Sequence, residues 1–202
     1  MPTLYTDNGI DRPNRRWPSY PIDPIFKYRW SPRSFDPAPI PREVLMTIFE
    51  AARWTMSCFN DQPWMFVVAD TDDQMDKFRG LLTGANQVWA KDVPVLGFIF
   101  ARRRFAHNDK DNDWGAFDCG AAWMALTLQA RMLGLYTHGM AGFDQKKVYE
   151  ALNVPESDYR ALIAFALGRI GDKEKLPDEM QKQEQPSDRV ALFETVNFGY
   201  LE

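Results

Sequence analysis

Short apolar runs bounded by proline constrain this sequence most, because they indicate where buried strands lie. Met65 to Ala69 and Val93 to Ala101 are rich in Val, Ile and Phe, with Pro63 before the first run and Pro94 near the start of the second. Runs of this kind predict interior strands. A third strand is predicted at Ala161 to Leu167.

Helices are predicted between and around these strands. A helix over residues 41–54 is indicated by one apolar face, made of Val44, Leu45, Ile48, Phe49 and Ala52. Pro41 suits its first helical position, and Glu43 complements the positive end of its dipole. The other predicted helices are Asp73 to Leu82, Trp114 to Leu133 and residues 145–153.

Sequence signals mark the ends of two of these helices. Gly134 can end the helix that begins at Trp114 by adopting a positive φ. After a predicted turn, T-H-G-M-A-G-F, Asp144 is the expected N-cap of helix 145–153, and Pro155 stops its continuation. Small residues in the longer helix would let another helix approach closely, and we interpret them as core packing rather than ligand contact: Gly115, Gly120, Ala121 and Ala122.

The two ends of the chain differ from its middle. Residues 1–27 are rich in proline and polar groups without a sustained period, which predicts an irregular surface arm. Residues 28–202 form the predicted domain. Near its end, residues 171–189 are charged and residues 190–201 turn apolar again, which predicts a C-terminal arm that docks elsewhere.

Composition excludes several classes of protein. The chain has 202 residues, 45% of them hydrophobic, which suits one domain with a sizeable core. A net charge of −4 gives no field that attracts nucleic acid or an anionic membrane, so a phosphate-bearing ligand would need a local cluster of arginines. Asp118, Gln129 and Arg131 interrupt the longest apolar segment, which argues against a membrane span.

Cysteine and histidine usage narrows the chemistry further. Two cysteines are too few for a disulfide framework, and the N-terminus lacks the pattern of a secretory signal, so we expect a cytoplasmic protein. His107 and His138 form no spaced pair with Cys, His or Glu, which argues against a transition-metal site. No motif for triad hydrolysis, ATP or dinucleotide binding occurs.

Two polar stretches are candidates for binding chemistry. S-C-F-N-D-Q-P-W at 57–64 is a loop between a predicted helix and a predicted strand, where binding residues are common. In Y-R-W-S-P-R-S-F at 28–35, Pro32 favours an extended backbone, so Arg29, Ser31 and Arg33 would share one side. That side suits a phosphate or a carbonyl edge. Arginines paired with nearby acids on a solvated strand edge are an equal alternative.

Three segments in order resemble the nitroreductase family of FMN-dependent oxidoreductases. They are R-W-S-P-R-S-F at 29–35, E-A-A-R-W-T-M-S-C-F-N-D-Q-P-W-M-F at 50–66 and G-L-Y-T-H-G-M-A-G-F-D at 134–144. L-G-R-I-G-D followed by P-S-D-R resembles the closing segment of the family. The resemblance implies an α+β, nitroreductase-like fold with a central, mostly antiparallel sheet flanked by helices. It also implies an intertwined homodimer with FMN at the interface.

The resemblance assigns residues from several segments to the binding of FMN. Arg29 and Ser31 would contact its phosphate together with Arg189, and Arg33 would face the N1 and C2 carbonyl region, with Trp30 in the same stretch. The 57–64 loop would approach the flavin from the second subunit, and backbone amides of the predicted glycine-rich turn would face N5 and the C4 carbonyl. These contacts would come from Met56, Ser57, Cys58, Asn60 and Gln62, and from Met140, Ala141 and Gly142, with Asn86 at the pyrimidine.

The sequence departs from the family pattern at three of these positions. Met56 stands where proline is usual, Cys58 where serine is common, and Ala141 where some members have an acid. The substrate preferences of individual members are therefore not transferred to this chain.

The implied activity belongs to the cofactor rather than to a catalytic side chain. NADH or NADPH would give a hydride to N5 and leave, and a nitroaromatic, quinone or related acceptor would then take the electrons in a ping-pong mechanism. A reductive dehalogenase or a flavin-consuming enzyme on the same fold is an alternative. A non-enzymatic flavin-binding or structural protein is another.

Overall fold

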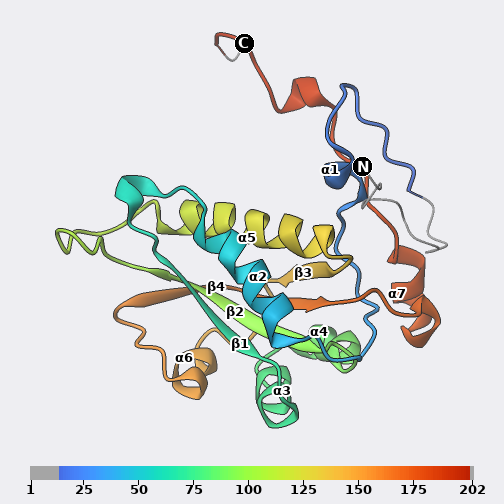
Figure 1. The fold of residues 1–202 in the computed structure, drawn as a ribbon, viewed down its shortest axis with the longest axis horizontal. Coiled ribbons are helices and arrows are strands. Elements are labelled where there is room, and N and C mark those ends of the chain that lie inside the picture. Colours follow the sequence, from blue (N-terminus) through green and yellow to red (C-terminus); the bar gives the residue numbers. More distant parts are fainter. Residues whose placement is uncertain (1–13, 201–202) are drawn as a thin grey trace.

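The computed structural model describes residues 14–200, and its centre is a four-stranded antiparallel sheet (Figure 1). The strands are β1 (Trp64–Ala69), β2 (Val95–Arg102), β3 (Tyr136–Met140) and β4 (Tyr159–Gly168), in the order β1-β2-β4-β3. Every neighbouring pair is antiparallel. The predicted α+β class and antiparallel sheet are confirmed.

Helices cover both faces of this sheet because its central strands are apolar on both sides. In β2, Val95 and Ile99 face α2 (Arg42–Arg53) and α5 (Gly115–Met132), while Phe98 and Phe100 face the opposite side. This alternation follows the two-residue period of a strand. The opposite side is covered by α3 (Asp72–Arg79), α4 (Gly84–Ala90) and α6 (Lys147–Leu152) (Figure 1).

One predicted turn is a strand. β3 occupies most of the T-H-G-M-A-G-F segment, where His138 and Gly139 pair with Ala166 and Phe165 of β4. A side chain at 139 would bring its Cβ to 3.3 Å from Ile163 and 3.5 Å from Trp123, so the glycine permits close packing here. The predicted turn is therefore wrong over residues 137–140. Glycine commonly breaks a strand, but Gly139 is needed here for close packing within one.

Helix boundaries differ from the predicted ones in their caps. Pro41 is the N-cap of α2 rather than its first helical residue. Helix α6 begins at Lys147, although the Asp144 carboxylate accepts hydrogen bonds from the amides at 146 and 147, as a cap does. Its last helical residue is Leu152, and Asn153, with a left-handed φ of 52°, is its C-cap, so the helix ends before Pro155 is reached. Gly134 has the predicted positive φ, 77°.

The remaining elements lie near the ends of the chain or in loops. A short helix, α1 (Pro24–Tyr28), interrupts the arm that was predicted to be irregular, and the Asp23 carboxylate caps it at the Ile25 amide. The others are η1 (Cys58–Asn60), η2 (Lys173–Lys175), α7 (Asp178–Gln183) and η3 (Leu192–Glu194). The predicted arm over 1–13 lies outside the described residues. The division at residue 28 stays a prediction.

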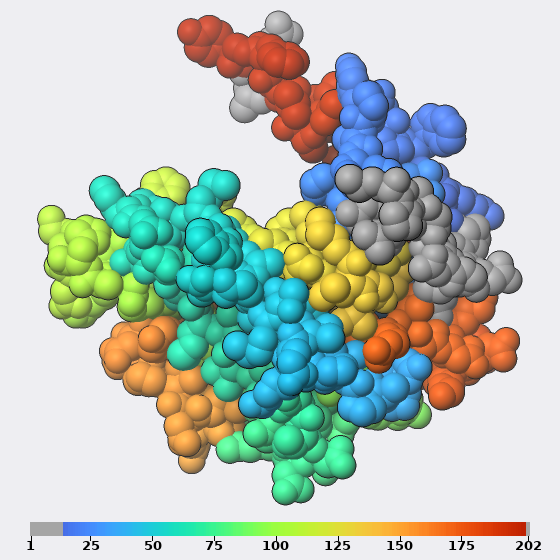
Figure 2. Space-filling view, viewed as in Figure 1, coloured from blue at the N-terminus to red at the C-terminus, as the bar shows by residue number. Residues whose placement is uncertain are grey.

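The N-terminal arm and the C-terminal segment project together from one end of the body. Figure 1 shows the stretch before α1 in blue beside the segment that carries η3 in red. Figure 2 shows the red segment and the blue stretch from residue 14 standing away from the body. The large apolar side chains of the C-terminal segment are exposed in the single chain: Val190, Leu192, Phe193, Val196, Phe198 and Tyr200. Their docking onto another surface stays a prediction.

Candidate functional site

The arginine stretch alternates between buried and more exposed side chains. Trp30, Pro32 and Ser34 are buried, whereas Arg29, Ser31 and Arg33 lie on the more open side. The alternation agrees with the extended backbone expected here. Trp30 thus belongs to the core, where its ring meets that of Tyr136 edge-on at 6.1 Å between centroids.

Arg29 and Arg189 are brought together although 160 positions separate them. Burial and the neighbouring charge of Arg189 lower the pKa of Arg29 below its ordinary value. The Arg29 Nε is buried and has no hydrogen-bond partner among the described residues. Within residues 14–200, neither guanidinium forms an ion pair with an acid. This arrangement favours an anionic ligand over the alternative in which the arginines pair with acids.

The backbone of the stretch is fixed from two sides. The buried carboxylate of Glu184, just after α7, accepts hydrogen bonds from the amides of Arg33 at 3.0 Å and Ser34 at 2.9 Å. From β3, His138 Nδ1 donates to the Pro32 carbonyl at 2.8 Å. Burial lowers the pKa of His138, which favours the neutral ring. These hydrogen bonds hold the backbone of residues 32–34 against the sheet.

Residues 140–142 lie beside α4. Asn86 Nδ2 donates to the Gly142 carbonyl at 2.9 Å, and the Thr83 amide donates to the same oxygen at 3.0 Å. A Cβ at 142 would lie 2.5 Å from Thr83 Oγ1 and 2.7 Å from Asn86 Nδ2, so a side chain there would collide with both. Trp89 of α4 packs on His138 at 4.8 Å between ring centroids. The structure thus places the arginine stretch along the start and middle of β3, and residue 86 beside residues 140–142 at its C-terminal end.

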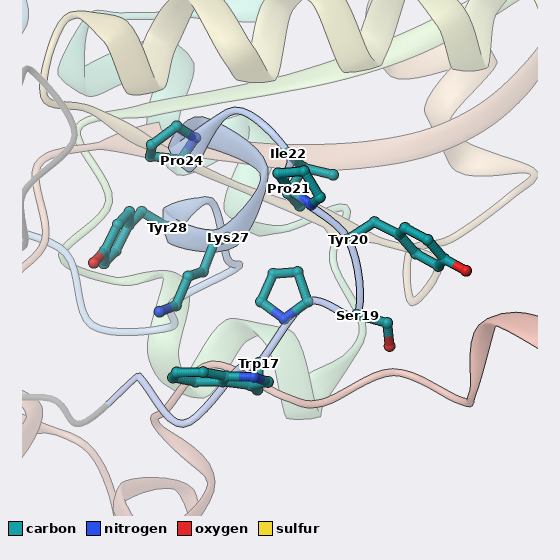
Figure 3. Close-up of a pocket in the computed structure, with 9 residues that line it drawn as sticks. Trp17, Ser19, Tyr20, Pro21, Ile22, Pro24, Lys27 and Tyr28 are labelled. Atoms are coloured by element: carbon teal, nitrogen blue, oxygen red, sulfur yellow. The ribbon is translucent and has the colours of Figure 1, made fainter.

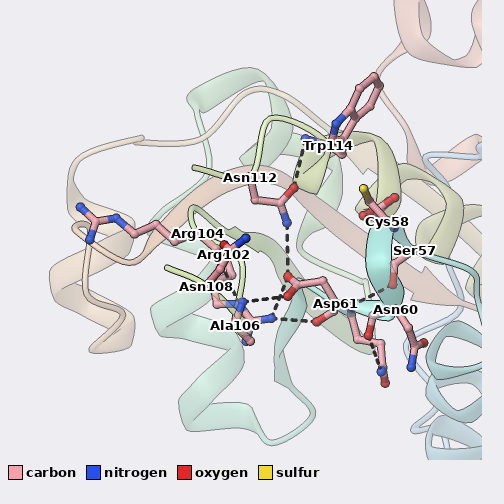
Figure 4. Close-up of polar contacts among 12 residues, drawn as sticks. Ser57, Cys58, Asn60, Asp61, Arg102, Arg104, Ala106, Asn108, Asn112 and Trp114 are labelled. Atoms are coloured by element: carbon pink, nitrogen blue, oxygen red, sulfur yellow. Dashed lines mark hydrogen bonds and ion pairs between the residues drawn. The ribbon is translucent and has the colours of Figure 1, made fainter. Parts of the chain in front are cut away.

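The 57–62 loop, which we call the knot, is strained. Phe59, Asn60 and Gln62 have φ values of 53°, 55° and 50°, in the left-handed region that non-glycine residues usually avoid. The Gln62 amide donates to Ser57 Oγ at 2.9 Å, and the Cys58 amide donates to the buried Asp118 carboxylate at 3.1 Å (Figure 4). Neighbouring elements therefore hold the knot in this shape.

Asp61 connects the knot to the loop that follows β2 (Figure 4). Its side chain is only 1% exposed, and its carboxylate lies 2.8 Å from Arg102 Nη2. It also accepts hydrogen bonds from the Ala106 amide at 2.8 Å and from Asn112 Nδ2 at 3.3 Å. Burial alone would raise the pKa of Asp61, but the bonds from Arg102 and Ala106 outweigh it and lower the pKa. Sequence analysis missed this residue, because its partners lie more than 40 positions away.

A single chain keeps the knot and the arginine stretch apart. The knot contacts Asp118 near the start of α5, whereas Arg131 near its end donates to the Tyr28 carbonyl at 3.5 Å. Asp118 and Arg131 are 13 positions apart (131 − 118), which is about 20 Å of helix at 1.5 Å per residue. Figure 1 shows the two regions at opposite ends of α5. The two regions are therefore separated by most of the length of α5 within one chain.

The face of α5 between these regions is open and apolar. Phe117 is 74% exposed, and Met56 beside the knot is 83% exposed. A Cβ at Gly120 would meet nothing within 4 Å, whereas one at Gly115 would lie 3.1 Å from the Arg102 carbonyl. The core-packing interpretation therefore holds for Gly115 and fails for Gly120. Figure 2 shows this surface as a concave region between the knot side and the N-terminal arm. Large exposed apolar surfaces mark interaction sites.

A hollow lies elsewhere, on the N-terminal arm (Figure 3). It has a volume of about 430 Å³ and is lined by aromatic side chains and prolines, with Lys27 between the rings of Trp17 and Tyr28. None of the predicted site residues lines it. It is an open fold of the arm, and we place the candidate site at the arginine stretch instead.

Residues 14–200 contain neither a membrane-spanning helix nor a metal-binding cluster. No helix there combines the length and apolar character that crossing a bilayer requires. No group of three or more His, Cys, Asp or Glu in the same residues is arranged to hold a metal ion.

The sequence is similar to a family model and to several known proteins. The model of the nitroreductase family matches residues 26–89 and 82–169. A relative in Bacillus subtilis (strain 168), under the provisional name NAD(P)H nitroreductase YdgI, is 25% identical over 185 residues, covering 74% of this chain and 88% of the relative. The CLA biosynthesis enone reductase of Lactiplantibacillus plantarum is 24% identical over 181 residues, covering 72% of this chain and 83% of the enzyme.

A solved structure gives a closer match. A crystal structure described as an oxidoreductase containing FMN is 40% identical, with a TM-score of 0.89, and the match covers 94% of this chain and 98% of that one. Because the family model also spans more than half of the sequence, the chain belongs to the nitroreductase family.

Proposed function

We propose that this protein is an FMN-dependent oxidoreductase that takes hydride from NADH or NADPH and delivers it to a small organic acceptor. The observation that carries the proposal is the pair Arg29 and Arg189. The two guanidinium groups lie close together, the Arg29 Nε is buried without a hydrogen-bond partner, and neither group forms an ion pair with an acid in the described residues. They are the two arginines to which the family resemblance assigns the flavin phosphate. The solved oxidoreductase at 40% identity contains FMN, which supports the same assignment.

The residues present fit the phosphate end and one edge of FMN. Arg29, Ser31 and Arg189 would hold the phosphate, because guanidinium forks and a hydroxyl match its oxygens. Arg33 would place a positive charge beside the pyrimidine edge, which favours reduction of the ring. Tight packing around Gly142 would bring backbone rather than side chain close to the ring. When bound, FMN supplies the hydride acceptor and donor.

A homodimer completes the proposed site. The knot and the arginine stretch of one chain are separated by the length of α5, and the open apolar face of α5 lies between them. Two copies packed with their α5 helices antiparallel would bring the knot of each to the arginine stretch of the other. The knot residues Met56, Ser57, Cys58, Asn60 and Gln62 would then act across the interface.

The acceptor class is wider than nitroaromatics and quinones. The Lactiplantibacillus plantarum relative is named as an enone reductase, so an activated carbon–carbon double bond is also a candidate acceptor. One pocket that serves both the donor and the acceptor has to admit different molecules in turn, which favours loose specificity. We therefore propose a quinone, a nitroaromatic and an enone as the first acceptors to test.

The visible spectrum of the purified protein tests the function directly. We expect a yellow protein whose flavin absorbance is bleached by NADH or NADPH without air and restored by an acceptor. Steady consumption of the nicotinamide should require the acceptor, which separates an enzyme from a flavin-storage protein. A colourless protein that cannot be reconstituted with FMN would overturn the proposal. A yellow protein that neither nicotinamide reduces would leave a flavoprotein without this activity.

A further inference from the structure

Arg16 is a buried charge in the N-terminal arm. Its residue is 8% exposed, although arginine is rarely buried without a partner. Its Nε donates to the Ser187 carbonyl at 2.7 Å, and its Nη1 donates to the carbonyls of Lys27 and Arg29, the former at 3.0 Å. One side chain therefore connects the arm, the start of the arginine stretch and the segment before Arg189.

Arg16 meets the two arginines of the candidate phosphate site through these carbonyls. Arg189 Nη1 donates to the Ser187 carbonyl at 3.3 Å, so Arg16 and Arg189 share one acceptor. Burial, followed by the charges of Arg189 and Arg29, lowers the pKa of Arg16 to about 10, and only Asp188 acts in the opposite direction. The guanidinium groups of Arg16, Arg29 and Arg189 are thus close together and repel one another. Asp188 is the nearby acid that partly offsets this repulsion.

Such a cluster is electrostatically incomplete as it stands. Like charges at close range and partial burial both destabilise the charged forms. A phosphate monoester carries about −1.5 to −2 charges near neutral pH and three acceptor oxygens, which would offset the excess positive charge. The Nε and Nη1 of Arg16 already donate hydrogen bonds to backbone carbonyls. Its contribution to phosphate binding is therefore to position the other two arginines and to add positive charge.

We propose that Arg16 is a positioning residue of the FMN phosphate site, which makes the N-terminal arm a working part of cofactor binding. The proposal rests on the function proposed above and extends it to a segment outside the predicted domain. It also gives the arm a specificity role, because flavins that lack the phosphate gain nothing from the cluster.

The experiment compares two flavins that differ only in the phosphate. Full-length Arg16→Met and wild-type proteins are stripped of flavin, and the dissociation constants of FMN and riboflavin are measured by fluorescence quenching at low and moderate salt. Arg15→Met is the matched control, because Arg15 is exposed and its loss changes the net charge equally. We expect Arg16→Met to bind FMN about tenfold to a hundredfold more weakly, the effect of losing a charged contact.

Riboflavin affinity decides what the loss means. We expect it to stay within about twofold in Arg16→Met, and the salt dependence of FMN binding to fall, because fewer positive charges face the phosphate. Equal weakening of both flavins would show a general structural role and overturn the proposal, as would unchanged FMN binding or the same loss in Arg15→Met. A wild type that binds neither flavin would overturn the proposed function itself, and this inference with it.

Discussion

Cys58 is the side chain of the knot that most resembles a catalytic group. It lies five residues beyond the end of α2, and within residues 14–200 its sulfur has no hydrogen bond. His107, remote in sequence, lies near the knot but packs its ring against Phe59 at 5.3 Å between centroids. The thiol therefore has the environment of a lining group.

We predict that Cys58→Ser retains FMN and keeps NAD(P)H-driven turnover within about tenfold, a barrier change of roughly 1.4 kcal/mol. The measurement is steady-state reduction of a quinone by matched, flavin-saturated wild type and variant. Cys119→Ser is a useful contrast, because that thiol is buried and burial, with the charge of Asp118, raises its pKa to about 12. A loss of several orders of magnitude in Cys58→Ser with flavin still bound would give the thiol a chemical role.

Residue types and spacing were enough to find the arginine stretch and the knot, but not Arg16 or Asp61. Arg29, Ser31 and Arg33 share a side because extended backbone imposes it locally, so sequence could predict them. Arg16 and Asp61 matter through partners 171 and 41 positions away, and no local pattern encodes such pairs. Polar residues whose role is to hold other residues are the ones that sequence reasoning misses.

At the scale of elements, periodicity predicted the long helices and apolar strands and missed the short elements. α2, α5, β2 and β4 present sustained apolar patterns, and each was predicted to within a few residues. β3 was missed because its glycine serves packing, and α4 because Gly84 and Asn86 suggest a loop. Both elements border the candidate site, where packing overrides local propensity.

We predict that Asp61→Asn loosens the knot without unfolding the sheet. An amide cannot serve all the donors that the carboxylate accepts from Arg102, Ala106 and Asn112, and we expect a loss of about 1–3 kcal/mol of stability. FMN retention should fall, because the knot would no longer be held in its strained shape. Thermal unfolding and flavin release measure the two effects. Asp113→Asn, at an exposed acid of the loop that follows β2, is the control and should change neither.

Unchanged FMN binding in Asp61→Asn would also be informative. If Asp61→Asn loses stability but binds FMN as tightly as the wild type, the knot does not contact the cofactor. The proposed contribution of the second copy would then lose its basis, while the phosphate site would stand.

At the scale of the whole molecule, the two groups of residues that we propose to bind FMN lie at opposite ends of α5. A symmetric dimer would therefore contain two sites, each built from both chains. This arrangement predicts complementation. An Asp61→Asn chain has an intact arginine stretch, and an Arg29→Ala chain has an intact knot, so a mixed dimer would contain one site with both parts unchanged.

We expect each variant alone to retain little FMN and the isolated mixed dimer to retain flavin in one of its two sites. Co-expression with two different affinity tags, followed by sequential purification, gives the mixed dimer, and the flavin content per chain is the measurement. A mixed dimer as empty as its parents would contradict a shared site. A flavin-loaded wild-type monomer in sedimentation would contradict it independently.

The strained shape of the knot also has a consequence for the order in which the protein matures. Asp118 and the partners of Asp61 lie between 41 and 60 positions further along the chain than the knot residues that they hold. Contacts between segments so far apart form only after the intervening chain has closed its own loops. We therefore expect residues 57–62 to leave the ribosome before the residues that hold them, and to acquire this conformation only once the start of α5 has also emerged. Competence to receive a cofactor is then a late event in the life of each chain.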